Sequence, residues 1–548
     1  MKKILNLKIV LLLIILLAAF FRFWQLGVNP PSLTWDEAAW GYNAYSLGID
    51  GRDEFGRFFP LNYLESFGDF KPPMYAYLDI IPVKLFGLNE FAARFPSALF
   101  GILTVLVTYF FTKRIFYKSK LSQIYALLAS GMLAISPWHI MLSRAAFEAN
   151  VASFFLVLGV WLFLAGIQNK KWYIILSAVS FALSLYTFNT ARIVAPLLVL
   201  ILAICFWKTL FQRKKQVIFA VIIGILLVLP TLKFLFSPQA GLRFQEVNIF
   251  SDIDVIKTAN QEIANDNNAW WSKIIHNRRL LYGIDFVHHY FDNLNPSFLF
   301  IKGDGNPKFS TQDTGEMYLW DLPFFIAGII FIFRKREGNW WIVPLWLVLG
   351  IIPAATARET PHALRIEATL PAFQIITAFG LVQLLVWIKG FKIKKYLSLF
   401  VIGLIGILLF FNIIYFYHGY MAHYATEFSG EWQYGYKDSI NYVLSVQDNY
   451  DYIQITTSLG RPYVYYLFYT KTDPRVYRQL TKIKRNPFGF VTVSGFGKYI
   501  FPDSFTSTLD KKARVLYISS PYNLPKNIKI LRTFYLLNGQ PVLIAYTI

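Results

Sequence analysis

Residues 30–56 read PPSLTWDEAAWGYNAYSLGIDGRDEFG, and residues 65–96 read ESFGDFKPPMYAYLDIIPVKLFGLNEFAARFP. Long apolar segments precede and follow this part of the chain. The acids Asp36 and Glu37 come soon after the first apolar segment, and Arg94 stands where the next one begins. Charged groups close to lipid are costly, so they usually mark a functional site. We therefore take this stretch as the centre around which the rest of the chain is organised.

Local physics separates the two adjacent acids. Pro30 and Pro31 end the first helix, and Thr34 to Glu37 then fits a capping box at the start of a new helix that ends near Gly48. Capping gives Glu37 a structural role, although a catalytic role stays open. Capping does not account for Asp36. A carboxylate at a helix start is stabilised in its ionised form by the helix dipole, so it can serve as a general base or a metal ligand.

Composition places the chain among polytopic membrane proteins. Of its 548 residues 55% are hydrophobic and 18% aromatic, and the mean hydropathy is +0.43. We predict about eleven apolar spans of roughly the length that a bilayer requires. They lie near residues 5–27, 95–112, 121–137, 151–167, 172–187, 192–207, 216–236, 319–333, 339–356, 367–388 and 397–417.

The net charge of +21 is a topology signal. Basic residues crowd the N-terminus and the loops after even-numbered spans, where Glu337 is the single acid. By the positive-inside rule these segments are cytoplasmic, so the charge does not indicate a nucleic-acid partner. The first loop (28–94), the long loop (237–318) and the C-terminus then lie outside a cytoplasmic, or inner, membrane. The lone cysteine, Cys205, excludes an intrachain disulfide and a cysteine metal cluster.

Other outside turns hold further charges. Arg144 and Glu148 are four residues apart, so they either pair on one helix face or contact a substrate. Arg192 is either a snorkelling arginine or an anion-binding one. His362 and Arg365 face one way on a helix, and His362 is either a structural hydrogen-bonding group or a ligand.

From about residue 425 the apolar runs shorten to strand length. We predict a transmembrane domain over residues 1–424 and an outside α/β domain over residues 425–548. The C-terminal domain should contain a helix at Lys437–Gln447 and strands at Tyr452–Thr457, Arg514–Ser519, Ile528–Leu537 and Gln540–Ile548. Asn538-Gly539 predicts a hairpin between the last two strands. No nucleotide-binding glycine loop occurs, so no nucleotide cofactor is expected.

The motifs together resemble a known family. They are the Asp-Glu pair after span one, Lys71-Pro72-Pro73, Phe-Gly-x-x-Glu-x-x-x-Arg-x-Pro over residues 86–96, Ser136-Pro137 with Ser143-Arg144 and Glu148, Tyr186-Thr187 with Arg192, and Pro361 to Arg365. This order is similar to that of membrane glycosyltransferases of the GT-C class. Within that class it more closely resembles the bacterial branch related to protein O-mannosyltransferases (dolichyl-phosphate-mannose-protein mannosyltransferases, glycosyltransferase family 39) and to the lipid A aminoarabinose transferase.

The resemblance implies transfer of a sugar from a polyprenyl-phosphate donor to a lipid, glycan or protein acceptor. It implies a mostly helical GT-C-like bundle in which Asp36 is the base, with Glu37 the other catalytic candidate. Lys71, Arg192 and Arg365 become candidates for phosphate contact. The whole set of substrate-binding candidates is Asp69, Lys71, Arg94, Arg144, Glu148, Arg192, His362 and Arg365.

One departure from the family bears on a metal cofactor. In the aminoarabinose branch an acid directly precedes Lys-Pro-Pro, whereas here Phe70 does and Asp69 lies one residue earlier. A divalent ion therefore stays open as a cofactor, with no ligands assigned. Two other classes remain as alternatives: a transporter or lipid-linked-sugar flippase, and a non-catalytic envelope assembly protein. The clustering of charges on one side of the membrane argues against a transporter, whose charges lie near the midplane.

Overall fold

The computed structural model describes residues 2–237, 240–241, 247–389, 395–485, 490–502, 513–522 and 524–548. The chain divides into two compact units, and each combines segments that are far apart in the sequence. Unit 1 comprises Met1–Phe21, Phe100–Leu142 and Glu148–Phe416. Unit 2 comprises Arg22–Leu99, Ser143–Phe147 and Tyr417–Ile548.

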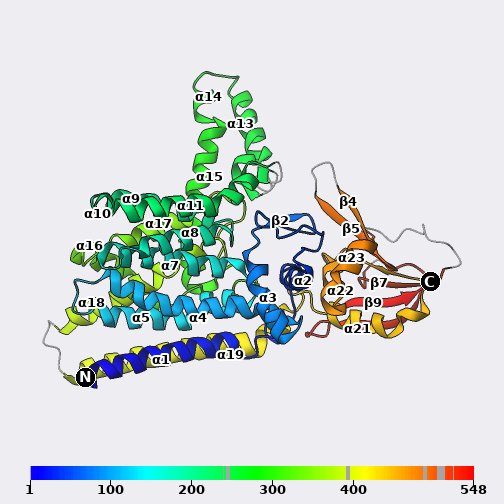
Figure 1. The fold of residues 1–548 in the computed structure, drawn as a ribbon, viewed down its shortest axis with the longest axis horizontal. Coiled ribbons are helices and arrows are strands. Elements are labelled where there is room, and N and C mark those ends of the chain that lie inside the picture. Colours follow the sequence, from blue (N-terminus) through cyan, green and yellow to red (C-terminus); the bar gives the residue numbers. More distant parts are fainter. Residues whose placement is uncertain are drawn as a thin grey trace. The chain divides into compact units, whose positions relative to one another are not determined.

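The apolar segments form helices. Every segment predicted to cross the membrane overlaps one of them, and the longest run side by side (Figure 1). Their bounds are α1 Lys2–Phe23, α4 Glu90–Ile115, α5 Ser122–Ile135, α6 Pro137–Arg144, α7 Glu148–Gln168, α8 Tyr173–Leu185, α9 Ala191–Cys205, α10 Trp207–Gln212, α11 Lys214–Leu235, α16 Asp321–Lys335, α17 Ile342–Ala355, α18 Ala372–Lys389 and α19 Lys395–His418.

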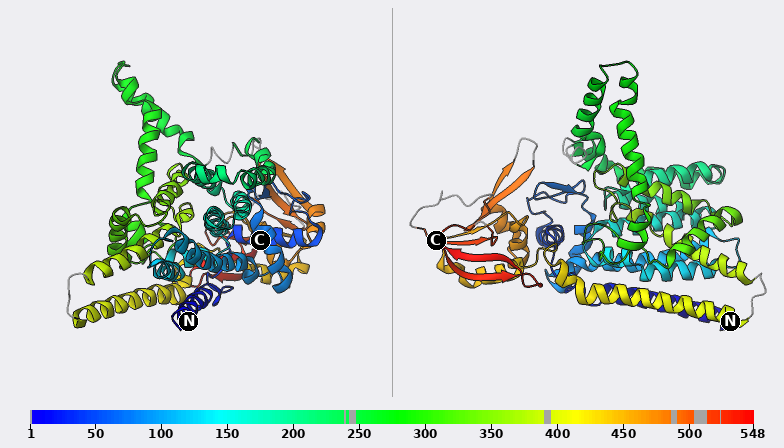
Figure 2. Two further views of the ribbon diagram at one scale, coloured as in Figure 1. Left: turned by 60° about the vertical axis from the view of Figure 1, so that its left-hand side comes forward. Right: turned by 180° about the vertical axis from the view of Figure 1, so that it is seen from behind.

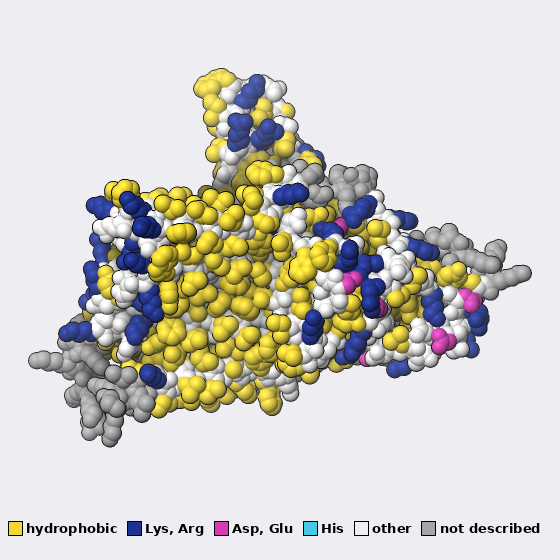
Figure 3. Space-filling model, viewed as in Figure 1, with side chains coloured by type: hydrophobic (Ala, Val, Ile, Leu, Met, Phe, Trp, Pro, Cys, Tyr) yellow, Lys and Arg dark blue, Asp and Glu magenta, His cyan; other side chains and the backbone are white. Residues whose placement is uncertain are grey.

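The length and composition of these helices are those of a membrane protein. Among the described residues four helices are long and apolar enough to cross a bilayer, or up to five if the bent pair α5 and α6 is one span. Four shorter apolar helices accompany them. Figure 3 shows a broad hydrophobic surface on the bundle, with Lys and Arg gathered at its left-hand end. The expected membrane fold is thereby confirmed, whereas the number of eleven spans stays a prediction.

Close backbone approach holds two of the bundle helices together. A Cβ atom added at Gly328 of α16 would lie 2.1 Å from the carbonyl oxygen of Ile376 in α18. One added at Gly380 of α18 would lie 2.0 Å from the carbonyl oxygen of Phe324. Lipid tails are as apolar as leucine, so membrane helices associate through such van der Waals contact rather than through hydrophobic exclusion.

A helical arm projects from unit 1. It consists of α13 (Ile253–Asn265), α14 (Ser272–Ile275) and α15 (Arg278–Asp292), preceded by the short turn η1 (Ile249–Ser251). All three views show the arm running crosswise to the long helices of the bundle (Figures 1 and 2). The remaining short turns of unit 1 are η2 (Phe298–Lys302) and η3 (Glu367–Thr369).

Unit 2 combines the first outside loop with the C-terminal segment. The loop contributes α2 (Trp35–Asp50), the hairpin of β1 (Leu64–Ser66) and β2 (Asp69–Lys71), and α3 (Met74–Phe86). The C-terminal segment contributes η4 Gly419–His423, α20 Tyr424–Phe428, α21 Tyr436–Val446, η5 Gln447–Asn449, β3 Tyr452–Ile455, α22 Pro462–Thr470, α23 Pro474–Leu480, β4 Thr481–Arg485, β5 Val491–Phe496, β6 Tyr499–Ile500, β7 Val515–Ser519, β8 Lys529–Tyr535 and β9 Pro541–Thr547.

The seven described C-terminal strands form one mixed sheet in the order β4-β5-β6-β3-β7-β9-β8. Strand β3 is parallel to β6 and β7, and the other neighbours are antiparallel. The predicted helix and four predicted strands are confirmed as α21, β3, β7, β8 and β9. The hairpin turn is confirmed too, with Gly539 at φ 83°. The sequence analysis did not predict β4, β5 or β6. The residues of β4, TKIKR, are largely exposed and lack apolar alternation, and β6 is only two residues long.

One hydrophobic core joins the first loop to the C-terminal segment. Ala38 and Tyr42 of α2 belong to the same buried cluster as Tyr465 and Leu467 of α22. The two helices approach so closely that a Cβ atom on Gly41 would lie 2.6 Å from the ring of Phe468. The contacts thus group the loop with residues after 424, while the predicted division of the chain at that residue stays a prediction.

Candidate functional site

The start of α2 holds both acids of the first loop. Thr34 caps the helix, and its hydroxyl accepts a hydrogen bond from the Glu37 N–H at 3.3 Å. The Glu37 carboxylate in turn accepts one from the Thr34 N–H at 2.9 Å. The predicted capping box is therefore confirmed. The helix ends two residues beyond Gly48, where Gly51 adopts a left-handed conformation that suits glycine.

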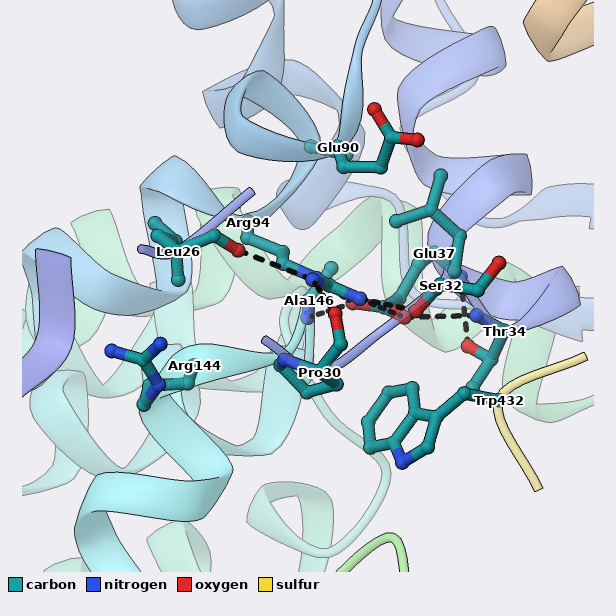
Figure 4. A network of polar contacts seen from close by, with 12 residues as sticks. Leu26, Pro30, Ser32, Thr34, Glu37, Glu90, Arg94, Arg144, Ala146 and Trp432 are labelled. Carbon is teal, nitrogen blue, oxygen red and sulfur yellow. Dashed lines mark hydrogen bonds and ion pairs between the residues drawn. The ribbon is translucent and has the colours of Figure 1, made fainter. Parts of the chain in front are cut away.

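The Glu37 side chain also holds a buried ion pair (Figure 4). Its Oε1 accepts from Arg94 Nε at 2.8 Å and from the Ala146 N–H at 3.0 Å. The two side chains of the ion pair are 1% and 0% exposed. A buried carboxylate needs a compensating charge and further hydrogen bonds, and Glu37 has both. The geometry therefore gives Glu37 a structural role, in agreement with the capping interpretation.

Arg94 uses all five of its N–H groups inside the protein. Besides Glu37, the acceptors are the carbonyl oxygens of Leu26 at 3.1 Å, Pro30 at 2.8 Å and Ser32. These bonds tie the turn before α2 to the first turns of α4. The sequence placed Arg94 among the substrate-binding candidates. In the structure all five N–H donors of its guanidinium already have acceptors within the protein, so none is left for a substrate.

Arg144 is buried in the same unit. It donates to the carbonyl oxygen of Asn29 at 2.8 Å and to the Tyr420 hydroxyl at 3.3 Å. Its guanidinium carbon lies 5.4 Å from the centre of the Tyr420 ring. The side chain is fully buried, so Arg144 joins the turn before α2 to the segment after α19. Glu148, its expected neighbour, is the first residue of α7 and belongs to unit 1.

Asp36 differs from Glu37 in its exposure. Its side chain is 43% exposed, and it forms an ion pair with Lys71, which is only 9% exposed. The Lys71 ammonium lies 5.1 Å from the Trp40 ring and 4.6 Å from the Phe67 ring. Aromatic faces favour a cation, so Lys71 is held in place while Asp36 stays accessible. Asp69, another candidate, lies on the same strand as Lys71, paired with Ser66 across the hairpin.

A buried polar network supports the Lys71 hairpin from behind. Asn43 of α2 donates to Ser66 Oγ at 3.0 Å and accepts from the Glu54 N–H at 3.0 Å. Tyr463 accepts from the Phe67 N–H at 2.8 Å. Burial raises the pKa of Glu54 to about 8, so that carboxyl is protonated near neutral pH. Sequence reasoning missed this network, although the charged Arg-Asp-Glu run at residues 52–54 was a visible signal.

Unit 1 holds the remaining candidates. His362 stacks on Phe309 with ring centres 4.9 Å apart, and its Nδ1 lies 3.9 Å from a carboxylate oxygen of Asp304. Burial lowers the pKa of His362 to about 3 and raises that of Asp304 to about 6. The imidazole is therefore neutral at neutral pH. Arg365 donates to the backbone carbonyl of Glu359 at 2.9 Å and to its carboxylate at 3.3 Å.

Arg192 lies at the start of α9. Its Nη1 donates to Asn189 Oδ1 at 2.8 Å and its Nε to the carbonyl oxygen of Leu185 at 3.2 Å. The guanidinium also lies 5.3 Å from the centre of the Phe234 ring. Among the described contacts its Nη2 has no hydrogen-bond partner. This nitrogen is buried, so it is a donor without an acceptor inside the described part of unit 1.

The structure brings some of the candidates together within each unit. Unit 2 contains the ion pairs Asp36 with Lys71 and Glu37 with Arg94, together with Asp69 and Arg144. Unit 1 contains Glu148, Arg192, His362 and Arg365. The prediction that His362 and Arg365 lie on one helix was wrong, because residues 361–366 form turns. Within the described part of the chain no group of three His, Cys, Asp or Glu side chains could hold a metal ion.

Comparisons with known proteins agree with the predicted resemblance. Residues 12–243 match the family model of dolichyl-phosphate-mannose-protein mannosyltransferases. Among curated proteins, "Putative mannosyltransferase YkcB" of Bacillus subtilis is 28% identical over 178 residues, which are 31% of this chain and 22% of that protein. An uncharacterized protein of Aquifex aeolicus is 28% identical over 149 residues, 27% of this chain and 28% of that protein. The matches thus span less than a third of either relative.

Two solved structures share the fold. ArnT from Cupriavidus metallidurans, bound to undecaprenyl phosphate, has a TM-score of 0.56 at 12% identity, over 99% of this chain and 98% of that one. The apo oligosaccharyltransferase of Archaeoglobus fulgidus has a TM-score of 0.50 at 14% identity, over 84% of this chain and 63% of that one. At these identities the likeness establishes the fold alone. The predicted fold, a mostly helical GT-C-like membrane bundle with a C-terminal α/β segment, is thereby confirmed.

The buried ion pair generates a stability prediction. Arg94→Met removes the charge that compensates Glu37 and leaves three carbonyl oxygens without their donor. Breaking a buried pair from one side costs about 3–5 kcal/mol, so the unfolding temperature of purified protein in detergent should fall markedly. Arg475→Met is the matched control, because its pair with Asp473 is at the surface of the same unit and should matter little. Equal unfolding temperatures for the two variants would contradict the structural role.

Proposed function

We propose that this chain is a membrane glycosyltransferase that moves a sugar from a polyprenyl-phosphate donor to a lipid, glycan or protein acceptor. The reaction takes place on the outer face of the cytoplasmic membrane, and Asp36 is the general base. The observation that carries the proposal is the contrast between the adjacent acids. Glu37 is buried and fully engaged, whereas Asp36 is accessible beside a fixed cation.

The exposed position of Asp36 suits a base. The carboxylate takes the proton from the hydroxyl or amine of the acceptor. At the same time the acceptor oxygen or nitrogen attacks the anomeric carbon of the sugar. The bond between this carbon and the phosphate oxygen breaks, and the polyprenyl phosphate leaves. A general base must lie within hydrogen-bonding distance of the proton that it removes. The Asp36 side chain is 43% exposed, so an acceptor can approach it.

Lys71 supports both partners of the reaction. Its ammonium lies against Asp36, so it holds the carboxylate in one position before the acceptor binds. Phosphate is a good leaving group that needs positive charge rather than an acid, and a lysine held by two aromatic rings supplies that charge without reorganisation. We further propose Arg192 and Arg365 as donor-phosphate contacts in unit 1. Asp69, Glu148 and His362 remain proposed substrate contacts, while Arg94 and Arg144 are better explained as structural.

The comparisons support the class of donor. The solved structure of ArnT contains undecaprenyl phosphate, and the matched family model is named for a dolichyl-phosphate sugar donor. A nucleotide-dependent reaction is not part of the proposal.

The first prediction of the proposal concerns Asp36. Asp36→Asn keeps the size of the side chain but removes the proton acceptor, so transfer from a polyprenyl-phosphate sugar should slow by about 10²–10⁴-fold. Purified protein and radiolabelled donor measure the rate. Donor binding should persist, because the substitution leaves the positive charges in place.

Asp50→Asn is the matched control for this test. It makes the same substitution on the same helix, at the opposite end, where Asp50 pairs with Arg478. This variant should transfer sugar at a rate close to that of the parent. Near-parental transfer by Asp36→Asn would exclude it as the base. Loss of parental transfer on chelation would assign Asp36 to a metal instead, and a donor recovered chemically intact would favour a transporter.

A second prediction concerns recognition of the donor phosphate by Arg192. Arg192→Ala should weaken binding of a polyprenyl-phosphate sugar more than Arg192→Lys does. Both variants lose the planar guanidinium that can donate two hydrogen bonds to one phosphate, but only the alanine variant also loses the positive charge. Arg334→Ala, which removes an arginine from the last turn of α16, is the control and should bind as the parent does. Equal affinities for Arg192→Ala and the parent, measured by calorimetry in detergent, would remove Arg192 from the donor site.

A third prediction concerns orientation. Cys205 is exposed, so it is first replaced by serine. In that background a cysteine at Leu61, which is 49% exposed, should react with a membrane-impermeant maleimide added to intact cells. A cysteine at Lys214, at the start of α11, should react only after the cells are opened. The opposite pattern would place the α2 acids on the cytoplasmic face and overturn the proposed location.

A further inference from the structure

The arm formed by α13, α14 and α15 carries an unpartnered apolar stripe. Leu280, Ile284, Val287 and Phe291 follow one another at intervals of four, three and four residues along α15. These intervals place the four side chains on one face of the helix. They are between 48% and 63% exposed, so nothing within the described chain covers them.

The opposite face of the arm is well anchored. Tyr282 of α15 is buried, and its hydroxyl donates to the carbonyl oxygen of Asp252 at 2.8 Å. At the base of the arm the Tyr290 hydroxyl donates to the carbonyl oxygen of Val348 at 2.9 Å, and His289 Nδ1 lies 2.9 Å from that of Ala357. The arm is thus a fixed part of unit 1, and its exposed stripe faces outward from an ordered element.

The tip of the arm extends the apolar surface and adds positive charge. Trp270 is 76% exposed and Ile274 is 62% exposed. Three basic residues lie beside them, and residues 267–280 contain no acid. The basic residues are Lys273, Arg278 and Arg279. In Figure 3 hydrophobic side chains run along the left edge of the arm, and basic side chains lie to their right.

The direction of the arm indicates what it contacts. It runs crosswise to the bundle helices, which cross the bilayer, so it lies along the plane of the membrane (Figures 1 and 2). Its base contacts Val348 in the middle of α17 and Ala357 just beyond the C-terminal end of that helix. The other end of α17 follows the basic run Arg334–Arg336. The arm therefore leaves the bundle toward the face opposite this basic loop.

We infer that the arm is a membrane-interface element that lies on the leaflet opposite the basic loops and binds anionic phospholipid headgroups. Amphipathic helices that lie in the interface combine an apolar stripe with basic residues, and tryptophan concentrates at the headgroup level. The stripe of α15 and Ile274 enter the acyl boundary, and the three tip cations contact the phosphates. This inference does not depend on the proposed catalytic activity.

Site-specific fluorescence in lipid nanodiscs tests the inference. Single cysteines at Ile274 and Ile284, placed in the Cys205→Ser background, are labelled with bimane. The control is Gln261→Cys on the exposed polar face of α13. In discs that contain phosphatidylglycerol, doxyl-labelled lipid should quench the probes at positions 274 and 284 but not at 261. Iodide in the water should show the reverse preference.

The charges are tested separately. Combined Lys273→Glu, Arg278→Glu and Arg279→Glu should reduce lipid quenching at position 274 in discs with phosphatidylglycerol and change it little in discs of phosphatidylcholine alone. Gel filtration and the unfolding temperature of each variant confirm that the protein is folded. Probes equally open to iodide at all three positions would overturn the inference, as would protection from both quenchers, which indicates a protein partner or a second copy. Equal lipid quenching in discs with and without phosphatidylglycerol would overturn the recognition of anionic lipid.

Discussion

A carboxylate removed from water must be matched by charge and hydrogen bonds, and Glu37 meets that requirement through Arg94, the Ala146 N–H and the cap of α2. The same arginine holds three carbonyl oxygens of the turn between α1 and α2. The ion pair therefore sets where α2 begins relative to α4. Every other feature of the first loop depends on this position, because α2 carries Asp36 on the turn that Glu37 anchors.

The division of roles between adjacent residues follows from helix geometry. Successive side chains on a helix point about 100° apart, so Glu37 can face the buried Arg94 while Asp36 faces outward. The β1–β2 hairpin then brings Lys71 to the exposed acid, and the rings of Trp40 and Phe67 keep the lysine there. In the function proposed above, Asp36 takes up the proton of the acceptor and Lys71 stabilises the leaving phosphate, with little rearrangement of either side chain.

The C-terminal segment supports the first loop through packing and hydrogen bonds. Its helix α22 packs on α2, and Tyr463 accepts a hydrogen bond from the turn of the β1–β2 hairpin. The protonated Glu54 and Asn43 complete a buried network behind Lys71. Residues nearly four hundred positions apart in the chain therefore fix one loop. Substitutions in this core would act on the site by loosening the hairpin, without contact to a substrate.

Local patterns in the sequence determined the apolar helices, the capping box at Thr34 and Glu37, the helix α21 and the strands β3, β7, β8 and β9, because periodicity, capping and turn chemistry are properties of neighbouring residues. The same patterns could not separate Arg94 and Arg144 from arginines with free donors. Whether the N–H groups of a guanidinium all have acceptors depends on carbonyl oxygens and hydroxyls from other segments, such as Leu26 and Tyr420. Likewise Glu54 contacts Tyr463, which is about four hundred residues away in the sequence, and Lys71 contacts Asp36 and Trp40 of helix α2. Tertiary structure therefore decided which charges are structural and which remain accessible, because burial and long-range hydrogen bonds are set by the fold.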